Sequence, residues 1–171
     1  MIAALVEVRR VPEAQAQPDD QLVQLIEQYE RPLYNFLLTL LRDSDLALDC
    51  AQDTFLRAYE NLRKHRPVNS SWLYTVARNR AMDHFRRQRR IEPNDDQLEH
   101  VPVTFGTDSM LGVHQVMEQL SPADREVLYL YDMAGFKTDE IAVMLGVRST
   151  AVRQRLSRAR ERFRVLYGAE T

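Results

Sequence analysis

The chain has 171 residues, enough for one medium-sized domain or two small ones. Its formal net charge of −2 excludes a protein that binds polyanions through bulk charge, so any nucleic-acid contact must come from a local concentration of basic residues. The single cysteine, Cys50, excludes an internal disulfide and fits a reducing cytoplasm, and no apolar run is long enough to insert into a membrane.

Helical periodicity recurs along almost the whole chain, and no run alternates as a strand would, which predicts an all-α fold. Residues 1–18 contain Ala-Gln repeats and two prolines, so we expect a loose arm there. In the first ten residues, MIAALVEVRR, the apolar residues precede the arginines, the reverse of the order in a secretory signal. After Asp19 and Asp20, leucines and aromatic residues at spacings of three and four from Leu22 to Leu41 predict a core helix, which Pro32 is expected to kink or restart.

The next helix, expected to start at 43–45, carries an acidic stripe. Asp49, Asp53 and Glu60 form the stripe, with Gln52 at its edge, and we expect no base on the same helix to neutralise the first two acids. Ordinary solvation and a contact surface for a basic partner explain this stripe equally well. A calcium site is not expected, because the alternating ligands and central glycine of a calcium loop are missing. The expected buried face comprises Leu48, Ala51, Phe55, Tyr59 and Leu62.

A third helix, capped by Ser70 or Ser71, has an apolar face and a basic face. Six arginines and one aspartate lie between Arg78 and Arg90. Aromatic and amide groups beside arginines are typical of a surface for single-stranded nucleic acid, because rings stack on bases and arginines follow the backbone. A buried tryptophan is an equally good interpretation of Trp72. The expected core residues are Leu73, Ala77, Ala81 and Phe85, and the opposite side carries Trp72, Thr75, Asn79, Asp83, Arg86 and Arg90.

Between residues 91 and 120 the chain holds six acids and no lysine or arginine. Prolines and glycines interrupt any long helix in its first half, so we interpret residues 91–109 as an acidic flexible linker. The chain is therefore expected to contain two small helical domains, at residues 19–90 and 110–168.

Residues 136–163 predict a helix-turn-helix, preceded by a helix that Ser121 caps and Pro122 starts. Thr138 is expected to cap its first helix and Gly146 to form the turn, because glycine tolerates a backbone that other residues resist. We expect Val147 to be buried between the two helices, and Ser149 or Thr150 to cap the second.

That second helix is expected to enter a DNA major groove. Seven arginines between Arg148 and Arg164 meet a single acid, Glu161, so pairing within the helix cannot neutralise them. A solvated surface helix is the alternative. The apolar stripe comprises Val152, Leu156, Ala159, Phe163 and Leu166; arginines 153, 160 and 164 flank one side and 155, 158 and 162 the other, to hold phosphates on both walls. Thr150, Gln154, Ser157 and Glu161 form the polar stripe between them, which would face base edges.

Four stretches, in this order and spacing, resemble the extracytoplasmic-function group of the sigma-70 family, the small promoter-specificity subunits of bacterial RNA polymerase. They are DCAQDTFLRAYENL, WLYTVARNRAMDHFRR, LSPADREVLYLYDMAGFKTDEIAVMLGV and AVRQRLSRARERF. The resemblance implies a cytoplasmic, non-enzymatic protein without cofactor or metal that binds core polymerase and directs promoter-specific transcription initiation. It makes residues 19–90 sigma region 2, residues 91–109 a connector through polymerase channels, and residues 110–168 sigma region 4.

The resemblance also implies residue roles. Binding to the coiled coil of the largest polymerase subunit falls on Asp49, Gln52 and Asp53. Reading and melting of the minus-ten element fall on the loop 65–71 and on Trp72, Asn79, Asp83, Arg86 and Arg87. Recognition of the minus-thirty-five element as duplex DNA falls on Arg148, Ser149, Thr150, Arg153, Gln154, Ser157 and Arg158. Control by a separate anti-sigma factor is implied by the habit of the family and by no residue.

Two other functions fit parts of the sequence. A helix-turn-helix repressor or activator would bind duplex DNA as a dimer, but the second arginine-rich helix and the lack of an evident dimer seam count against it. A metal-dependent nuclease could use the acids of the second helix, and would lose cleavage when Asp49 or Asp53 is replaced by alanine.

Overall fold

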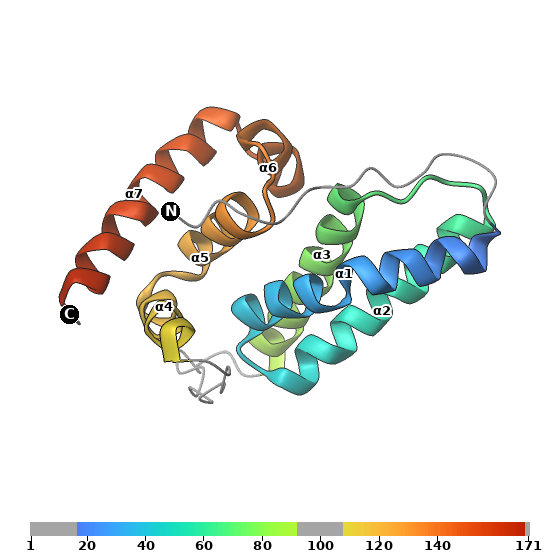
Figure 1. Cartoon of the computed structure of the whole chain (residues 1–171), viewed down its shortest axis with the longest axis horizontal. Coiled ribbons are helices and arrows are strands. Elements are labelled where there is room, and N and C mark those ends of the chain that lie inside the picture. The colour runs from blue at the N-terminus through green and yellow to red at the C-terminus, as the bar shows by residue number, and fades with distance from the viewer. Residues whose placement is uncertain (1–16, 92–107, 170–171) are drawn as a thin grey trace. The chain divides into compact units, whose positions relative to one another are not determined.

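The chain folds into two compact helical units, which the computed structural model describes over residues 17–91 and 108–169 (Figure 1). Within these ranges helix is the only regular structure, which confirms the all-α prediction. The first unit contains α1 (Pro18–Leu41), α2 (Ser44–Arg63) and α3 (Ser70–Ile91). The second contains α4 (Asp108–Gln119), α5 (Pro122–Leu128), the π-helix η1 (Tyr129–Met133), α6 (Thr138–Leu145) and α7 (Ser149–Ala169). The predicted arm and linker fall almost entirely outside the described residues.

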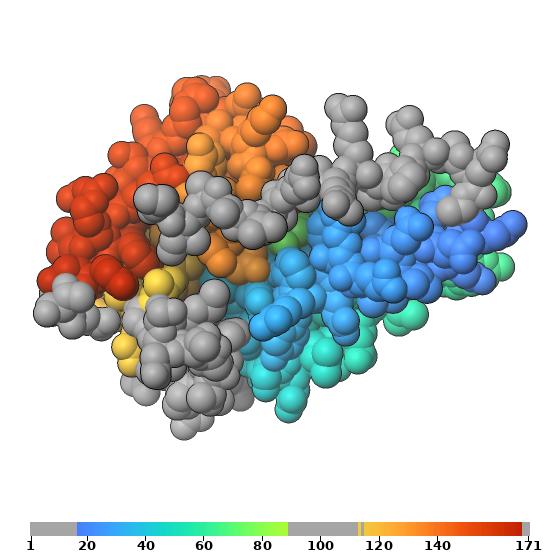
Figure 2. Space-filling view, in the orientation of Figure 1, coloured from blue at the N-terminus to red at the C-terminus, as the bar shows by residue number. Residues whose placement is uncertain are grey.

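In the first unit α1 packs along both α2 and α3, and α2 packs on α3. Leu33, Phe36 and Leu37 of α1 and Leu73 of α3 are fully buried. The rings of Phe36 and Tyr74 lie 5.2 Å apart in a tilted arrangement, which is a favourable aromatic geometry. Figure 2 shows side chains of α1 as a blue band on the surface of this unit. Burial of each of these aliphatic side chains stabilises the fold by about 1.5–3 kcal/mol. The cluster therefore fixes α2 and α3 relative to α1 and leaves their outer faces accessible.

Pro32 does not interrupt α1. The helix runs from Pro18 to Leu41 in one piece, so the expected restart is wrong. Proline removes one backbone hydrogen bond, but buried leucines on both sides of it keep the two halves of the helix packed on the same core. Arg42 follows with a φ of 57° and donates its N–H to the Leu38 carbonyl at 2.9 Å, which ends the helix.

Asn69 caps α3, and neither Ser70 nor Ser71 does. Asn69 Oδ1 accepts the N–H of Trp72 at 2.8 Å, and the Asn69 carbonyl accepts the N–H of Leu73 at 3.0 Å. The helix begins at Ser70, two residues earlier than a Ser71 cap would allow. Asparagine is as good a cap as serine, so composition alone could not choose among the three neighbours.

The second unit is built around α7, which packs on α4, α5 and α6. Ser121 caps α5 as predicted, with Pro122 at the first helical position and the Ser121 hydroxyl accepting the N–H of Asp124 at 3.2 Å. One fully buried aliphatic residue from each helix, and one from η1, form the core: Val116, Val127, Leu130, Ile141 and Val152.

The predicted helix-turn-helix is formed by α6, the turn after it, and α7. Gly146 ends α6 with a φ of 66°, in the left-handed region that favours glycine, which confirms its expected role. Val147 is 41% exposed, so its expected burial is wrong. Its N–H donates to the Ala142 carbonyl at 3.0 Å, so the turn satisfies the backbone of Val147 while its side chain stays accessible.

Both helices of this motif start differently from the prediction. Lys137 takes the cap position of α6, one residue before the expected threonine, and its N–H donates to Glu140 Oε2 at 2.8 Å. Arg148 precedes α7 and its carbonyl accepts the first helical bonds, so Ser149 and Thr150 are helical residues and not caps. The Ser149 hydroxyl is therefore available for contacts inside the motif.

Candidate nucleic-acid and protein interfaces

The outer face of α2 combines acids with accessible leucines. Asp49 and Gln52 are exposed, and Leu48 and Leu56 are 48% and 64% exposed. The expectation that Leu48 belongs to the core is therefore wrong. Helical spacing places Leu48, Gln52 and Leu56 in one line, a turn apart, with Asp49 beside it. A mixed apolar and acidic face is more typical of a protein contact surface than of a purely solvated helix.

The inner face of α2 is filled mainly by small residues, which explains this error. A helix lined with alanines can approach its neighbour closely, so α2 needs fewer large residues where it packs on α1. Thr54 is fully buried there and donates its hydroxyl to the Cys50 carbonyl at 2.8 Å. The buried residues of α2 are Ala47, Cys50, Ala51, Thr54, Phe55, Ala58 and Leu62.

Asp53 is neutralised within the first unit. Its Oδ2 lies 3.0 Å from Nε of Arg57, one turn further along α2, and 2.5 Å from Nε of Arg80 on α3. The expectation of an unneutralised stripe is therefore wrong for Asp53, while no ion pair reaches Asp49 within the described ranges. Arg57 was visible in the sequence at helical spacing, whereas the contact with Arg80 depends on the packing of α2 against α3.

A shallow pocket between α2 and α3 brings two of the predicted sets together. Asp49 and Asp53 from α2 line it, as do Asp83 and Arg87 from α3. Cys50 lies in the same pocket, and burial raises the pKa of its thiol. Residues predicted to bind polymerase and residues predicted to contact the minus-ten element therefore share one border on this unit.

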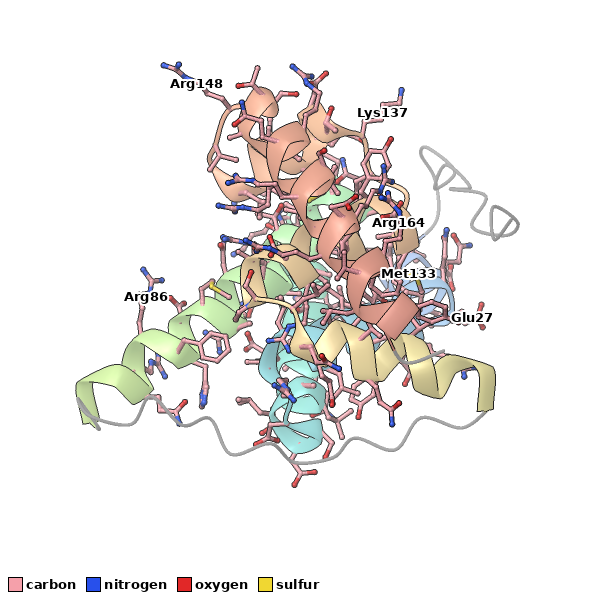
Figure 3. The ribbon with its side chains drawn as sticks, turned by 90° about the vertical axis from the view of Figure 1, so that its left-hand side faces the viewer. Glu27, Arg86, Met133, Lys137, Arg148 and Arg164 are labelled. Carbon is pink, nitrogen blue, oxygen red and sulfur yellow. The ribbon has the colours of Figure 1, made fainter. Side chains whose placement is uncertain are left out.

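On α3, the predicted DNA residues differ in accessibility. Asn79, Arg86 and Arg87 are exposed, and Figure 3 shows Arg86 projecting outward from the helix. Arg86 also pairs with Asp83 one turn before it, which fixes the direction of its guanidinium. Trp72 is half-buried, so the structure leaves room both for a packing role and for an accessible ring edge.

The first half of α7 presents the predicted duplex-facing residues to solvent. Thr150, Gln154 and Ser157 are exposed, as are Arg153 and Arg158. Arg148, immediately before the helix, is exposed as well (Figure 3). Ser149 differs from them, because it is half-buried and its hydroxyl contacts the Thr138 hydroxyl of α6 at 3.5 Å. The same hydroxyl accepts a hydrogen bond from Arg153 at 2.9 Å.

The second half of α7 uses its arginines inside the unit. Arg160 pairs with Asp132 of η1, and Arg162 Nη1 lies 2.5 Å from Asp124 Oδ2 of α5. Arg164 pairs with Glu161 on α7 itself. The expectation that the flanking arginines hold DNA phosphates stays a prediction, and in this half the arginines also make ion pairs inside the unit. The partners of Arg160 and Arg162 lie on other helices, so periodicity along α7 could not reveal them.

The described residues contain neither a metal-binding cluster nor a membrane-spanning helix. No group of three or more His, Cys, Asp and Glu side chains in those ranges is arranged to hold a metal ion. No helix in those ranges is both long enough and apolar enough to span a membrane.

The known proteins and family models that resemble this chain all belong to one class of protein. Residues 25–91 match the family model for sigma-70 region 2, and residues 110–163 match that for sigma-70 region 4. The chain is 30% identical to the ECF RNA polymerase sigma factor SigM of Bacillus subtilis over 155 residues, which cover 84% of this chain and 93% of SigM. It is 28% identical to the ECF RNA polymerase sigma factor SigE of Mycolicibacterium smegmatis over 159 residues, 82% of this chain and 59% of SigE.

The fold agrees with this class. The sigma factor RpoE of Bartonella quintana, solved in complex with the anti-sigma factor NepR, superposes with a TM-score of 0.74 at 24% identity, covering 89% of this chain and 99% of RpoE.

The two matched regions, with a helix-turn-helix in the second, define a sigma factor of RNA polymerase. The chain belongs to the extracytoplasmic-function group of the sigma-70 family. It is therefore a transcription initiation factor that binds core polymerase and promoter DNA, and it is not an enzyme. Family membership replaces the alternatives of a dimeric repressor and of a nuclease.

Proposed function

We propose that this sigma factor docks on the coiled coil of the largest polymerase subunit through the outer face of α2. Asp49, Gln52 and Asp53 supply the polar contacts, and the exposed leucines Leu48 and Leu56 supply the apolar ones. The exposure of these two leucines beside Asp49 is the observation that carries the proposal. A helix face that contacts only water does not need two large apolar side chains, whereas a protein contact surface does. Asp53 takes part in this contact although its carboxylate already pairs with two arginines. The carboxylate of Asp49 is therefore the more available of the two for a polymerase residue.

We propose that α3 and the loop before it contact the minus-ten element and help to melt it. Asn79, Arg86 and Arg87 are the accessible polar and basic groups on this helix, and Trp72 offers a partly accessible ring. Stacking or wedging by an aromatic ring offsets an unstacking cost of about a few kcal/mol per base step. Asp83 acts here by orienting Arg86.

We propose that the first half of α7 recognises the minus-thirty-five element in the major groove. Arg148, Arg153 and Arg158 provide the positive charge, and Gln154 and Ser157 lie on the same exposed surface. Recognition helices place their N-terminal residues at base edges, which agrees with the accessibility of this half. Ser149 takes part by orienting Arg153, since its hydroxyl accepts a hydrogen bond from that guanidinium.

We further propose that the protein acts in the cytoplasm and that a separate anti-sigma factor controls it. The support for such control is that RpoE was solved in complex with the anti-sigma factor NepR.

The docking proposal is tested with Asp49→Lys. Affinity for core polymerase should fall about tenfold or more, because a basic side chain would then face a basic partner surface. Glu30→Lys on α1 is the matched control, since it makes the same charge change at another exposed position. Equal affinities for the two variants in a binding titration would contradict the assignment.

The recognition proposal is tested by selecting duplexes from a random library with the reconstituted holoenzyme. Arg158→Ala should weaken binding to the selected duplex by about 1–3 kcal/mol and relax the preference at one position if the guanidinium reads a base. A loss that is equal for all sequences would make Arg158 a phosphate contact instead.

A further inference from the structure

The chain between α5 and α6 contains a turn of π-helix. The N–H of Ala134 donates to the Tyr129 carbonyl at 2.8 Å, an i to i−5 bond, where an α-helix would use i−4. Such a turn accommodates one extra residue and shifts the side chains that follow. Single π-turns inside helical segments frequently mark functional positions. Here the turn carries two neighbouring side chains, Tyr131 and Asp132, that both contact α7.

Their common partner is Arg160. Its guanidinium pairs with the carboxylate of Asp132 through two nitrogens, with Nε to Oδ2 at 3.3 Å. The Arg160 Cζ lies 4.8 Å from the centre of the Tyr131 ring, within the range of a cation–π contact. The hydrogen bond that Arg160 donates to Asp132 raises the pKa of this guanidinium. Two consecutive residues of η1 therefore hold one arginine of α7.

A second pair acts on the same half of α7. Asp124 is a buried acid in the first turn of α5, and its Oδ2 lies 2.5 Å from Nη1 of Arg162. Arg160 and Arg162 lie on opposite flanks of the apolar stripe, as helical spacing requires. Two carboxylates from the preceding elements thus grip α7 from both sides.

We propose that Asp132 and Asp124 are positioning residues for promoter recognition. They hold the second half of α7 against its own unit, neutralise Arg160 and Arg162, and confine the grip on DNA phosphates to the first half of the helix. This inference rests on the proposed recognition of duplex DNA by α7. The distance from Ser149 to Arg160 is roughly 16 Å at 1.5 Å per residue, so a small rotation at the held end moves Gln154 and Arg158 relative to the bases.

A positioning role for Asp132 and the net charge of the unit predict opposite effects of an Asp132 substitution on DNA affinity. Replacement of Asp132 by a neutral residue makes the unit more basic, which by charge alone strengthens DNA binding. If Asp132 positions α7, the same change weakens binding to the preferred duplex. An exposed ion pair contributes little, so we expect Asp132→Asn to lower that affinity by about two- to fivefold.

The test uses the full chain assembled with core polymerase and two probes, the duplex selected from a random library and a scrambled duplex of the same length. Affinities are measured over a series of salt concentrations for wild type, Asp132→Asn, Arg160→Gln and Arg153→Gln. Each phosphate contact contributes about 0.9 to the slope of log affinity against log salt. Arg153→Gln should reduce the slope by about 0.9, whereas Arg160→Gln should leave it unchanged.

Exchanging the charges of Asp132 and Arg160 distinguishes an ion pair within the protein from a direct contact of Arg160 with DNA. The double variant Asp132→Arg with Arg160→Asp restores the pair with reversed polarity, so it should recover most of the affinity lost in Asp132→Asn. Circular dichroism on each variant confirms that the measurement is made on folded protein. A slope reduced by Arg160→Gln as much as by Arg153→Gln, or tighter binding by Asp132→Asn, would overturn the inference.

Failure of the underlying recognition proposal gives a different pattern. In that case Arg153→Gln and Arg158→Ala also leave the slope and the preference for the selected duplex unchanged, and α7 does not read DNA. Loss in those two variants together with tighter binding by Asp132→Asn would instead reject only the positioning role.

Discussion

Asp53 combines a structural contact with a proposed functional one. Its Oδ2 faces Arg57 on the same helix and Arg80 on α3, so it ties α2 to α3 at the edge of the proposed docking face. Asp49 lies one turn earlier on that helix and is exposed. Arg57, four residues after Asp53, already distinguishes this acid from Asp49 in the sequence, and the packing of α3 adds the contact with Arg80.

We predict that Asp53→Asn and Asp49→Asn separate these two effects. Asp53→Asn should lower the free energy of unfolding by about 0.5–1 kcal/mol, because partly exposed ion pairs contribute no more than that, and should also weaken binding to core polymerase. Asp49→Asn should weaken binding without a change in stability. Urea unfolding and a polymerase titration on both variants provide the measurements, and equal loss of stability in the two would count against the difference.

Cys50 gives a prediction about alkaline pH. Burial raises the pKa of its thiol, Arg80 opposes the rise, and Asp53 and Asp49 add to it. A pKa that is higher in the folded chain means that folding favours the neutral thiol. This contribution to stability is complete below the ordinary thiol value of 9.0 and is lost as the pH rises through the folded value.

Wild type should therefore lose unfolding free energy above about pH 9 faster than Cys50→Ala does, whatever the offset between them at pH 7. Urea unfolding of both proteins between pH 7 and pH 10.5 measures the difference. Parallel pH profiles would show that the thiol is not desolvated. The other ionisable groups are present in both proteins, so their contributions cancel in the comparison.

At the scale of single helices, the positions of helices with large periodic residues could be predicted from the sequence. A helix face packed through small residues, and ion pairs between different helices, could not. The periodic leucines of α1 and the glycine turn before α7 were sufficient to place both elements. The buried face of α2 was misassigned at Leu48 because alanines fill the contact with α1. The neutralisation of Arg160 was missed because its partner, Asp132, lies on a π-turn that no periodicity predicts.

The start of α3 offers a test at this scale. Asn69→Ala should destabilise the protein by about 1 kcal/mol, because it removes the acceptor for the Trp72 N–H at the helix N-terminus. The same variant should impair promoter melting, since Trp72 and the loop before it would lose their fixed start. Ser70→Ala is the matched control, with an expected change below about 0.5 kcal/mol.

Urea unfolding measures both stabilities, and permanganate footprinting of holoenzyme on a promoter fragment measures melting. A larger loss for Ser70→Ala than for Asn69→Ala would make Ser70, one of the two serines that the sequence offered, the cap.

At the scale of the whole molecule, the chain divides its tasks between two units that each have a core. Leu33, Phe36 and Leu73 are buried in the first unit, and Ile141 and Val152 in the second. The proposed contacts with polymerase and with melted DNA fall on the first unit, and the contact with duplex DNA falls on the second. Because the two units belong to one chain, binding of one unit makes the contact of the other intramolecular. This raises the effective concentration of the second unit at its promoter element.

Separate cores predict separate responses to damage. Leu73→Ala should lower the stability of the first unit by about 2–5 kcal/mol, because it leaves a cavity where the side chain is now fully buried. Hydrogen exchange should then accelerate across α1, α2 and α3 while the amides of α6 and α7 keep their wild-type protection. Ile141→Ala should give the reverse pattern.

Function should divide in the same way. Near the unfolding midpoint of the first unit, Leu73→Ala should lose polymerase binding, whereas Ile141→Ala should keep it and lose the preference for the minus-thirty-five sequence. Exchange measured by mass spectrometry on both variants decides the structural part, and a polymerase titration decides the functional part. If either variant accelerated exchange equally in both units, the chain would unfold as one cooperative body, and a single core mutation would then remove both promoter contacts together.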